Sequence, residues 1–254
     1  GKAQIKNKLL EIVDIMVKAG YEVTIYPTQA RADALNLVQK RAKKYDLVVC
    51  SGGDGTLDEA VSGMMLSEKK VPLGYIPAGS TNDFANSLKI PKEMVKAAKA
   101  AVSGKKFACD VGKFNDSFII YVAAFGIFTA VSYHMRVEYE DQVIEDEFIY
   151  GMITNSNSVG GFKNMTGKNV LLDDGKFEVT LIRKPKNLVE LNEILAFLSN
   201  MIDDTDAIYS FKSDCITFYA EEKVPWTLDG EYGGNPQEVK ISNQQQALEI
   251  MVKK

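Results

Sequence analysis

The sequence predicts an α/β protein with two domains, an N-terminal α/β domain built on a parallel sheet and a C-terminal antiparallel β-sandwich domain. Three observations support this fold class. Helical and strand-like segments alternate over the first hundred residues, and short links between them are typical of a parallel sheet. Glycine-rich loops directly follow two of the predicted strands. Short strand-like runs separated by turn residues then fill most of the second half.

The elements of the first half follow from hydrophobic periodicity. Apolar residues at helical spacing predict a helix over residues 3–19, ended by Gly20. The remaining expected elements are a strand at 21–26, a helix at 30–44, strands at 46–50 and 72–76, and a helix at 91–102. Because the alternation begins on a helix, we expect the first strand of the sheet to be missing, and residues 245–254 are a candidate to complete it.

The second half has a different pattern, which places a domain boundary near residues 104–105. Alternating or β-branched runs predict strands at 107–113, 117–124, 135–139, 147–154, 177–183, 216–220 and 239–241. Only residues 188–202 have the periodicity of a helix, and a last strand is expected at 247–252. The expected domains are therefore 1–104 and 105–244.

Composition excludes several classes of protein. The 254 residues are 46% hydrophobic and 25% charged, which is ordinary for a globular protein, and the net charge of −4 gives no support to a nucleic-acid surface. Three cysteines far apart in the chain favour reduced thiols and a cytoplasmic location. No signal peptide or spanning segment is expected. His134 is the single histidine, so a general base is expected to be a carboxylate.

The sequence SGGDGT at residues 51–56 is a candidate phosphate-binding loop. It lies between a predicted strand and a predicted helix, where backbone N–H groups and the helix dipole can face an anion. It is not a Walker A loop, because no lysine follows Gly55, and Asp58 replaces the third glycine of a dinucleotide fingerprint. The alternative is a tight turn without a ligand, but such a turn does not require the carboxylate of Asp54.

Two further motifs carry polar side chains at expected turns. Residues 77–84, PAGSTNDF, follow the next predicted strand, and loops after neighbouring parallel strands share one edge of the sheet. The alternative there is a helix cap from Ser80, Thr81 or Asn82. In the second half, Asp229 and Glu231 flank a glycine in WTLDGEYGG at 226–234, where the alternative is a solvated hairpin turn.

Together these motifs resemble the diacylglycerol-kinase catalytic-domain family, in its bacterial lipid-kinase branch, which is related to sphingosine kinases and NAD kinases. The match covers nearly the whole chain. It rests on SGGDGT at 51–56, GYIPAGSTNDFA at 74–85, CDVG at 109–112, LLDDGKFEV at 171–179 and TLDGEYGG at 227–234. The resemblance implies a nucleotide domain like that of NAD kinases and phosphofructokinases, a β-sandwich domain, and an active site in the cleft between them.

The resemblance also implies roles for particular residues. The cofactors would be ATP and Mg²⁺, with Asp54 organising the catalytic Mg²⁺, and with Asp229 and Glu231 as the acid/base pair that takes the proton of a lipid hydroxyl. A structural Mg²⁺ would be held by the Asp174 carboxylate and the carbonyls of Leu171 and Lys176, and Asp110 would link that site to the catalytic centre. The residues expected to bind ATP are Thr28, Gly52, Gly53, Asp54, Gly55, Thr56, Leu57, Asp58, Gly79, Ser80 and Asn82.

The expected activity is transfer of the γ-phosphate of ATP to diacylglycerol, giving phosphatidic acid. Open alternatives are another lipid alcohol, a sphingoid base or NAD as acceptor, or a non-catalytic nucleotide- or lipid-binding regulator. The resemblance implies a homodimer that contacts its lipid substrate transiently at the inner face of the membrane. A basic face is one candidate for that contact and scattered solvated lysines are the alternative; these lysines are Lys69, Lys70, Lys89, Lys92, Lys96, Lys105, Lys106, Lys163 and Lys168. The sequence departs from the family where the opening strand and its loop are absent and where the region 125–135 is short.

Overall fold

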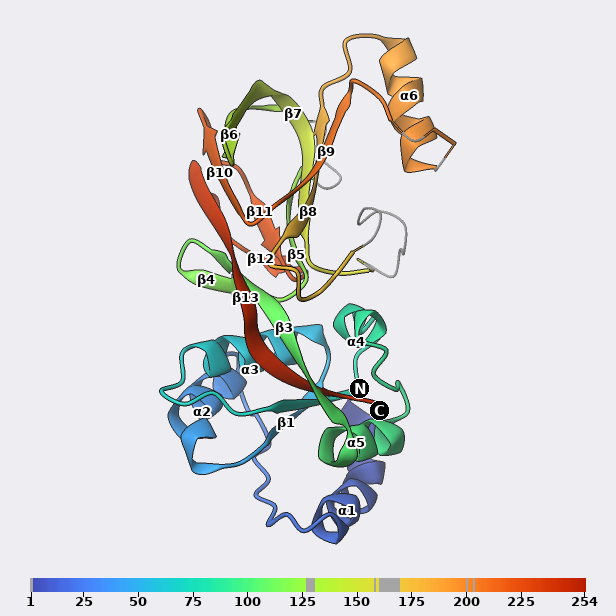
Figure 1. The fold of residues 1–254 in the computed structure, drawn as a ribbon, viewed down its shortest axis with the longest axis vertical. Coiled ribbons are helices and arrows are strands. Elements are labelled where there is room, and N and C mark those ends of the chain that lie inside the picture. Colours follow the sequence, from blue (N-terminus) through green and yellow to red (C-terminus); the bar gives the residue numbers. More distant parts are fainter. Residues whose placement is uncertain (1, 127–130, 158, 160–169, 200, 203) are drawn as a thin grey trace. The chain divides into compact units, whose positions relative to one another are not determined.

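The computed structural model describes residues 2–126, 131–157, 159, 170–199, 201–202 and 204–254 (Figure 1). The chain forms two compact units, unit 1 from residues 1–111 and 246–254 and unit 2 from residues 112–245. Two strands pass through these divisions, β3 at Lys105–Phe114 and β13 at Glu238–Val252. The mixed α/β class with parallel strands in the N-terminal part is confirmed. Lys163 and Lys168 lie outside the described residues, as does part of the short region at 125–135.

Unit 1 is a small parallel sheet covered by helices. Strand β2 pairs in parallel with β1 on one side and with the end of β13 on the other, where Ile250 lies opposite Leu73. Helix α5 packs on β2 and α1 packs on α5, while α3 packs on β1 and α2 packs on α3 (Figure 1). The bounds are α1 Lys2–Lys18, α2 Asp33–Arg41 with a 3-10 turn at Ala42–Lys44, β1 Val48–Gly52, α3 Asp54–Met65, β2 Leu73–Pro77, α4 Asp83–Ser87 and α5 Met94–Ser103.

The strand predicted at residues 21–26 is wrong. Residues 21–29 lie in irregular backbone and pair with no strand among the described residues. Alternation of apolar and polar residues favours an extended segment, but a strand also needs a neighbour for its backbone hydrogen bonds. The end of β13 joins the sheet beside β2, so it does not supply that neighbour next to β1.

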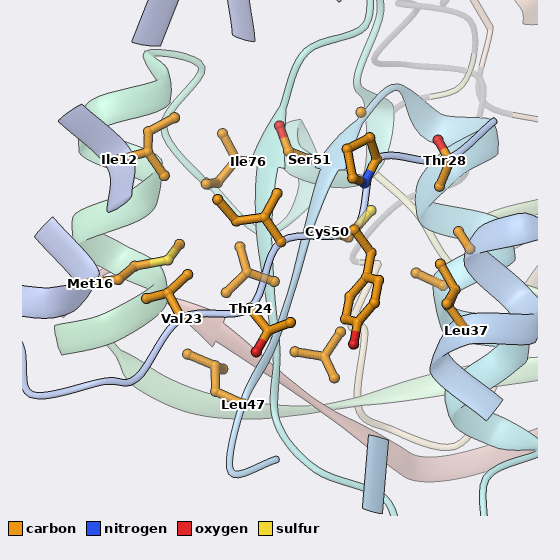
Figure 2. A pocket seen from close by; sticks show the side chains of 18 of the residues that line it. Ile12, Met16, Val23, Thr24, Thr28, Leu37, Leu47, Cys50, Ser51 and Ile76 are labelled. Atoms are coloured by element: carbon orange, nitrogen blue, oxygen red, sulfur yellow. The ribbon is translucent and has the colours of Figure 1, made fainter. Parts of the chain in front are cut away.

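A cavity of about 830 Å³ lies along β1 in unit 1 (Figure 2). Its wall is largely apolar and comes from α1, α2, β1 and the irregular segment, with labelled side chains Ile12, Met16, Val23, Leu37, Leu47 and Ile76. The apolar side chains of the irregular segment therefore line this cavity instead of packing in a sheet.

Unit 2 is built from antiparallel strands. β7 is the central strand and pairs with β5, β6 and β8, while β10 pairs with β6 and β13. The ring of Trp226 packs edge-on against Phe114, Phe125 and Phe218 in the centre of the core. The remaining bounds are β4 Ser117–Ile119, β5 Val122–Phe125, β6 Tyr133–Tyr139, β7 Gln142–Thr154, β8 Phe177–Arg183, α6 Leu188–Leu198, β9 Ile208–Ser213, β10 Cys215–Ala220, β11 Trp226–Leu228 and β12 Glu231–Tyr232.

Three details of unit 2 differ from the sequence prediction. The run at 117–124 is two strands, because Ile120 and Tyr121 leave the strand pattern. Strand β9 was not predicted, since IYSFKS carries polar residues on both faces. The two strands expected near the C-terminus are one strand, β13, in which Gln246 has a positive φ of 49°.

Candidate active site

The glycine loop of unit 1 leads directly from β1 into α3. Strand β1 ends at Gly52 and α3 begins at Asp54, with Gly53 in extended conformation at the N-cap position. The N–H groups of Thr56 and Leu57 both donate to the carbonyl of Gly53. A Cβ on Gly52 would lie 2.6 Å from the Thr56 Cβ, so the turn requires glycine there. This places a helix N-terminus and its dipole at the loop, which is a favourable environment for phosphate.

The loop after β2 lies against the first loop. The N–H of Ala78 donates to the carbonyl of Gly52 over 2.7 Å. A Cβ on Gly79 would lie 2.7 Å from the Gly53 Cα, so the two backbones approach through a pair of glycines. The two loops are therefore neighbours, as expected, and only glycine permits so close an approach of the two backbones.

Asn82 holds the second loop in place, and Tyr75 lies close to both loops. Asn82 Oδ1 accepts from the Gly79 N–H over 3.0 Å, and Asn82 Nδ2 donates to the Gly79 carbonyl over 2.7 Å. The hydroxyl of Tyr75 lies 3.1 Å from the Gly52 carbonyl oxygen and 3.3 Å from Asn82 Oδ1. Asn82 occupies the N-cap position of α4 but makes no side-chain capping bond, so its side chain orders the loop rather than capping the helix.

Two carboxylates lie side by side at these loops. Asp54 Oδ2 accepts from the Asn82 N–H over 3.0 Å, and Asp54 Oδ1 is buried with no hydrogen-bond partner among the described residues. Burial raises the pKa of Asp54, and the charge of the neighbouring Asp83, itself 2% exposed, raises that pKa further. An ionised acid with one bare buried oxygen next to a second acid is the environment that a cation stabilises.

The residues at these loops fit a magnesium ion. Mg²⁺ prefers oxygen ligands, and in nucleotide sites it is held by one or two carboxylates together with phosphates and water. Asp54 and Asp83 supply two carboxylates, and Oδ1 of Asp54 accepts no hydrogen bond from the described residues.

The other predicted ATP-binding residues lie on the same unit. Thr28 lines the cavity along β1 (Figure 2). Gly52, Gly53 and Thr56 line the same cavity. Ser80 is exposed on the second loop, and Gly55 and Asp58 are half-buried in the first turn of α3. Leu57 is 1% exposed, so its side chain belongs to the core and only its backbone is available to a ligand.

The TLDGE motif of unit 2 forms the hairpin between β11 and β12. Asp229 and Gly230 both have positive φ, 48° and 86°, as the two central residues of a type I′ turn require. The hairpin alternative is thus correct for the backbone, but Asp229 is buried rather than solvated, with 4% exposure.

The Asp229 carboxylate is held by backbone. It accepts N–H bonds from Ile120 over 2.6 Å, from Tyr121 over 3.0 Å and from Val122 over 2.9 Å. The hydroxyl of Tyr121 donates in turn to the Asp229 carbonyl. These bonds explain why the run at 117–124 is interrupted, since the N–H groups between β4 and β5 bond to this side chain. Glu231 follows on β12 and is exposed.

The predicted structural Mg²⁺ site does not fit its residues. Asp174 Oδ1 accepts from the Lys176 N–H over 3.0 Å, and Asp174 Oδ2 lies 3.1 Å from Lys212 Nζ. Leu171 is 55% exposed.

Asp110, the residue expected to connect the two metal sites, is fully buried in unit 1. Its Oδ1 accepts from the N–H of Gln246 over 2.7 Å, at the residue where β13 takes a positive φ. This hydrogen bond stabilises β13 at its irregular point, and the expected link of Asp110 to the catalytic centre stays a prediction.

Sequence reasoning missed two residues of the first site, Asp83 and Tyr75. Both stand inside the GYIPAGSTNDFA motif, so their proximity to the loop was the available signal. Lys212 was missed as well, because it belongs to β9, a strand the sequence did not predict.

Comparisons with known proteins identify the class. Residues 1–114 match the model of the diacylglycerol kinase catalytic domain. The chain is 33% identical to a diacylglycerol kinase of Staphylococcus carnosus, covering 92% of this chain and 86% of the relative, and 30% identical to one of Bacillus subtilis, covering 92% and 87%. A crystal structure of a diacylglycerol kinase from Bacillus anthracis superposes with a TM-score of 0.85 at 26% identity, covering 98% and 92%.

A more distant structure defines the wider fold. An NAD kinase from Archaeoglobus fulgidus, solved with ATP, has a TM-score of 0.58 at 14% identity, covering 97% of this chain and 90% of that one, and shows the fold alone. The fold is thus that of the NAD kinase-like α/β proteins. The chain belongs to the diacylglycerol kinase family of lipid kinases, and it is a phosphotransferase that uses ATP as phosphate donor. None of the helices formed by the described residues has the length and hydropathy of a bilayer-spanning segment.

Proposed function

We propose that this protein is an ATP-dependent diacylglycerol kinase, which transfers the γ-phosphate of ATP to the hydroxyl of diacylglycerol and forms phosphatidic acid. The observation that carries the proposal is the pair of touching glycine loops around Asp54, whose buried Oδ1 has no partner among the described residues. The family membership and the names of the relatives support the lipid acceptor.

In unit 1, phosphate binding falls to backbone and helix rather than to a lysine. The N-terminus of α3 would face the phosphates, and Thr28 and Ser80 would add hydroxyls at their exposed positions. Asp54 and Asp83 would hold Mg²⁺, which when bound neutralises charge on the transferred phosphoryl group. Phosphoryl transfer depends mainly on such positioning and charge neutralisation.

In unit 2, we assign the two acids of the TLDGE motif different tasks. A carboxylate accepts about four hydrogen bonds, and Asp229 already accepts three from backbone N–H groups, so it is a positioning residue that fixes the hairpin. Glu231 lies two residues away on β12 and is exposed, so it is the better acceptor for the proton of the substrate hydroxyl. A well-placed carboxylate base contributes about 10²–10⁴-fold to such a step.

We also propose that the protein reaches its lipid through transient contact with the membrane at the cytoplasmic face, and that it works as a homodimer. Seven of the nine candidate lysines are described, and all seven are exposed in unit 1, but Lys96 pairs with Glu93 and Lys106 with Glu249. Binding to anionic vesicles that weakens with salt would support the basic face, and binding that ignores salt would contradict it. Light scattering of the purified protein tests the dimer.

The substrate is tested with purified protein, radiolabelled ATP, Mg²⁺ and separate micelles of diacylglycerol or a sphingoid base, with NAD as a soluble acceptor. We expect labelled phosphatidic acid and little product from the other two. Preferential labelling of the sphingoid base or of NAD would show that diacylglycerol is not the acceptor and would identify the labelled compound as the substrate instead. No labelled product with nucleotide binding intact would favour a non-catalytic regulator.

A further inference from the structure

The turn before β8 carries a compact cluster of three charges. Lys212 Nζ lies 3.1 Å from Asp174 Oδ2 and 2.9 Å from Glu178 Oε1. Glu178 on β8 and Lys212 on β9 are direct cross-strand partners in the antiparallel register. The sheet itself therefore fixes the ammonium between the two carboxylates.

The cluster is partly withdrawn from water. The side chains of Glu178, Asp174 and Lys212 are 5%, 22% and 32% exposed. Glu178 Oε1 forms an ion pair with the Lys212 ammonium, which lies 2.9 Å away. Two poorly solvated carboxylates repel one another unless a cation stands between them, and here the cation is the lysine.

Contacts from other parts of the protein also anchor the turn. Gly175 takes a positive φ of 78°, and a Cβ there would lie 3.0 Å from the side-chain Cδ of Gln245. Gln245 Nε2 donates to the Asp173 carbonyl over 3.4 Å. Lys176, the lysine of the turn itself, lies 3.6 Å from Glu140 and so points to a different acid.

We propose that the Lys212 ammonium supplies, at the Asp174 turn of this chain, the positive charge that the family resemblance assigns to a structural Mg²⁺. The Asp174 carboxylate is engaged by the Lys176 N–H on one oxygen and by Lys212 on the other, and an ammonium at this distance opposes the entry of a divalent cation. The turn is then stabilised by a strand-borne lysine and is independent of divalent metal.

The test measures thermal unfolding of the full chain at pH 8, without nucleotide, in an Asp54→Asn background that removes the cation site of unit 1. We expect Mg²⁺ in place of EDTA to shift Tm by less than about 1 °C. A larger rise in Tm that disappears in Asp54→Asn/Asp174→Asn would show a metal at the turn and overturn the proposal.

The lysine is tested directly in the same background. Lys212→Met, which keeps the aliphatic stem, should lower Tm in EDTA by about 4–8 °C, whereas Lys176→Met serves as the matched control and should change it by less than about 2 °C. Equal small effects of the two substitutions would overturn the proposal. If Lys212→Met does not fold, Lys212→Arg should keep the parent Tm in EDTA, and a Tm that then depends on Mg²⁺ would contradict the inference. Because these readouts are unfolding temperatures, they are independent of whether the lipid assignment holds.

Discussion

The SGGDGT loop of unit 1 and the TLDGE hairpin of unit 2 each place an aspartate next to a glycine, but Asp54 is half-buried and Asp229 is buried, and their carboxylates differ in their partners. Asp54 keeps one oxygen bare and has Asp83 beside it. Asp229 accepts hydrogen bonds from three backbone N–H groups, and each of its two carboxylate oxygens takes part in at least one of them. The Asp54 carboxylate is therefore satisfied by the protein on one oxygen only, whereas the Asp229 carboxylate is well satisfied.

We propose that this difference separates a ligand-binding carboxylate, Asp54, from a structural one, Asp229. A carboxylate oxygen that is buried without a donor destabilises the fold, and such a group is expected where a cation or substrate compensates for it in the working state. A buried carboxylate with three N–H donors stabilises the fold even when no ligand is bound. Substitution of each acid should consequently change different measured quantities.

The largest effect is expected for Asp54→Asn. The amide keeps the shape but loses the charge that would hold Mg²⁺, so the kinase kcat should fall by about 10³-fold or more. The Tm should stay constant or rise, because a poorly solvated negative charge next to Asp83 disappears. Steady-state kinetics and calorimetry on the same preparation measure kcat and Tm. A large loss of Tm together with the loss of kcat would show that Asp54 is a structural carboxylate like Asp229.

The second-largest effect on activity is expected for Glu231→Gln. We expect kcat to fall by about 10²-fold with little change in the KM for ATP, because the proton acceptor is lost while unit 1 is intact. The exposed side chain should leave the free energy of unfolding within about 0.5 kcal/mol of the parent. A variant as active as the parent would rule out Glu231 as the base.

Asp229→Asn should mainly reduce the stability of the protein. One oxygen becomes an NH₂ group that faces backbone donors, so the free energy of unfolding should fall by about 2–3 kcal/mol and Tm by about 4–10 °C. Activity should decline together with the order of the hairpin. Denaturant unfolding measures the change, with Glu231→Gln as the matched control, and an unaltered midpoint would mean that the three N–H bonds contribute little.

The smallest effect concerns pH. Folding raises the pKa of Asp54 above its ordinary value of 3.8, so the folded state binds this proton more tightly than the unfolded state. The contribution of Asp54 to stability is therefore complete at low pH and is lost as pH rises through the raised pKa. Calorimetry from pH 4 upwards should show this decline in the parent and a flatter profile in Asp54→Asn. Identical profiles would contradict the assigned environment.

Much of the architecture was readable from the sequence because local patterns and tertiary packing agree. The periodicity of 3–19, the β-branched run before Ser51 and the glycines of the two loops predicted elements that the structure contains. The strand at 21–26 failed because alternation reports a preference for extended backbone and not the presence of a pairing partner. The strand β9 was missed for the converse reason: its partner β8 stabilises a sequence with little pattern of its own.

The sequence by itself determined the family, the mixed α/β class and the order of the glycine motifs, since these depend on residue types at fixed spacing along the chain. Tertiary structure decided which acids are satisfied. Backbone N–H groups more than a hundred residues away bond to Asp229, and Lys212, brought by an adjacent strand, stands at Asp174. Hydrogen-bond donors on a backbone have no signature in residue identity, and the charge that neutralises a carboxylate is set by proximity in space, which only the folded chain creates.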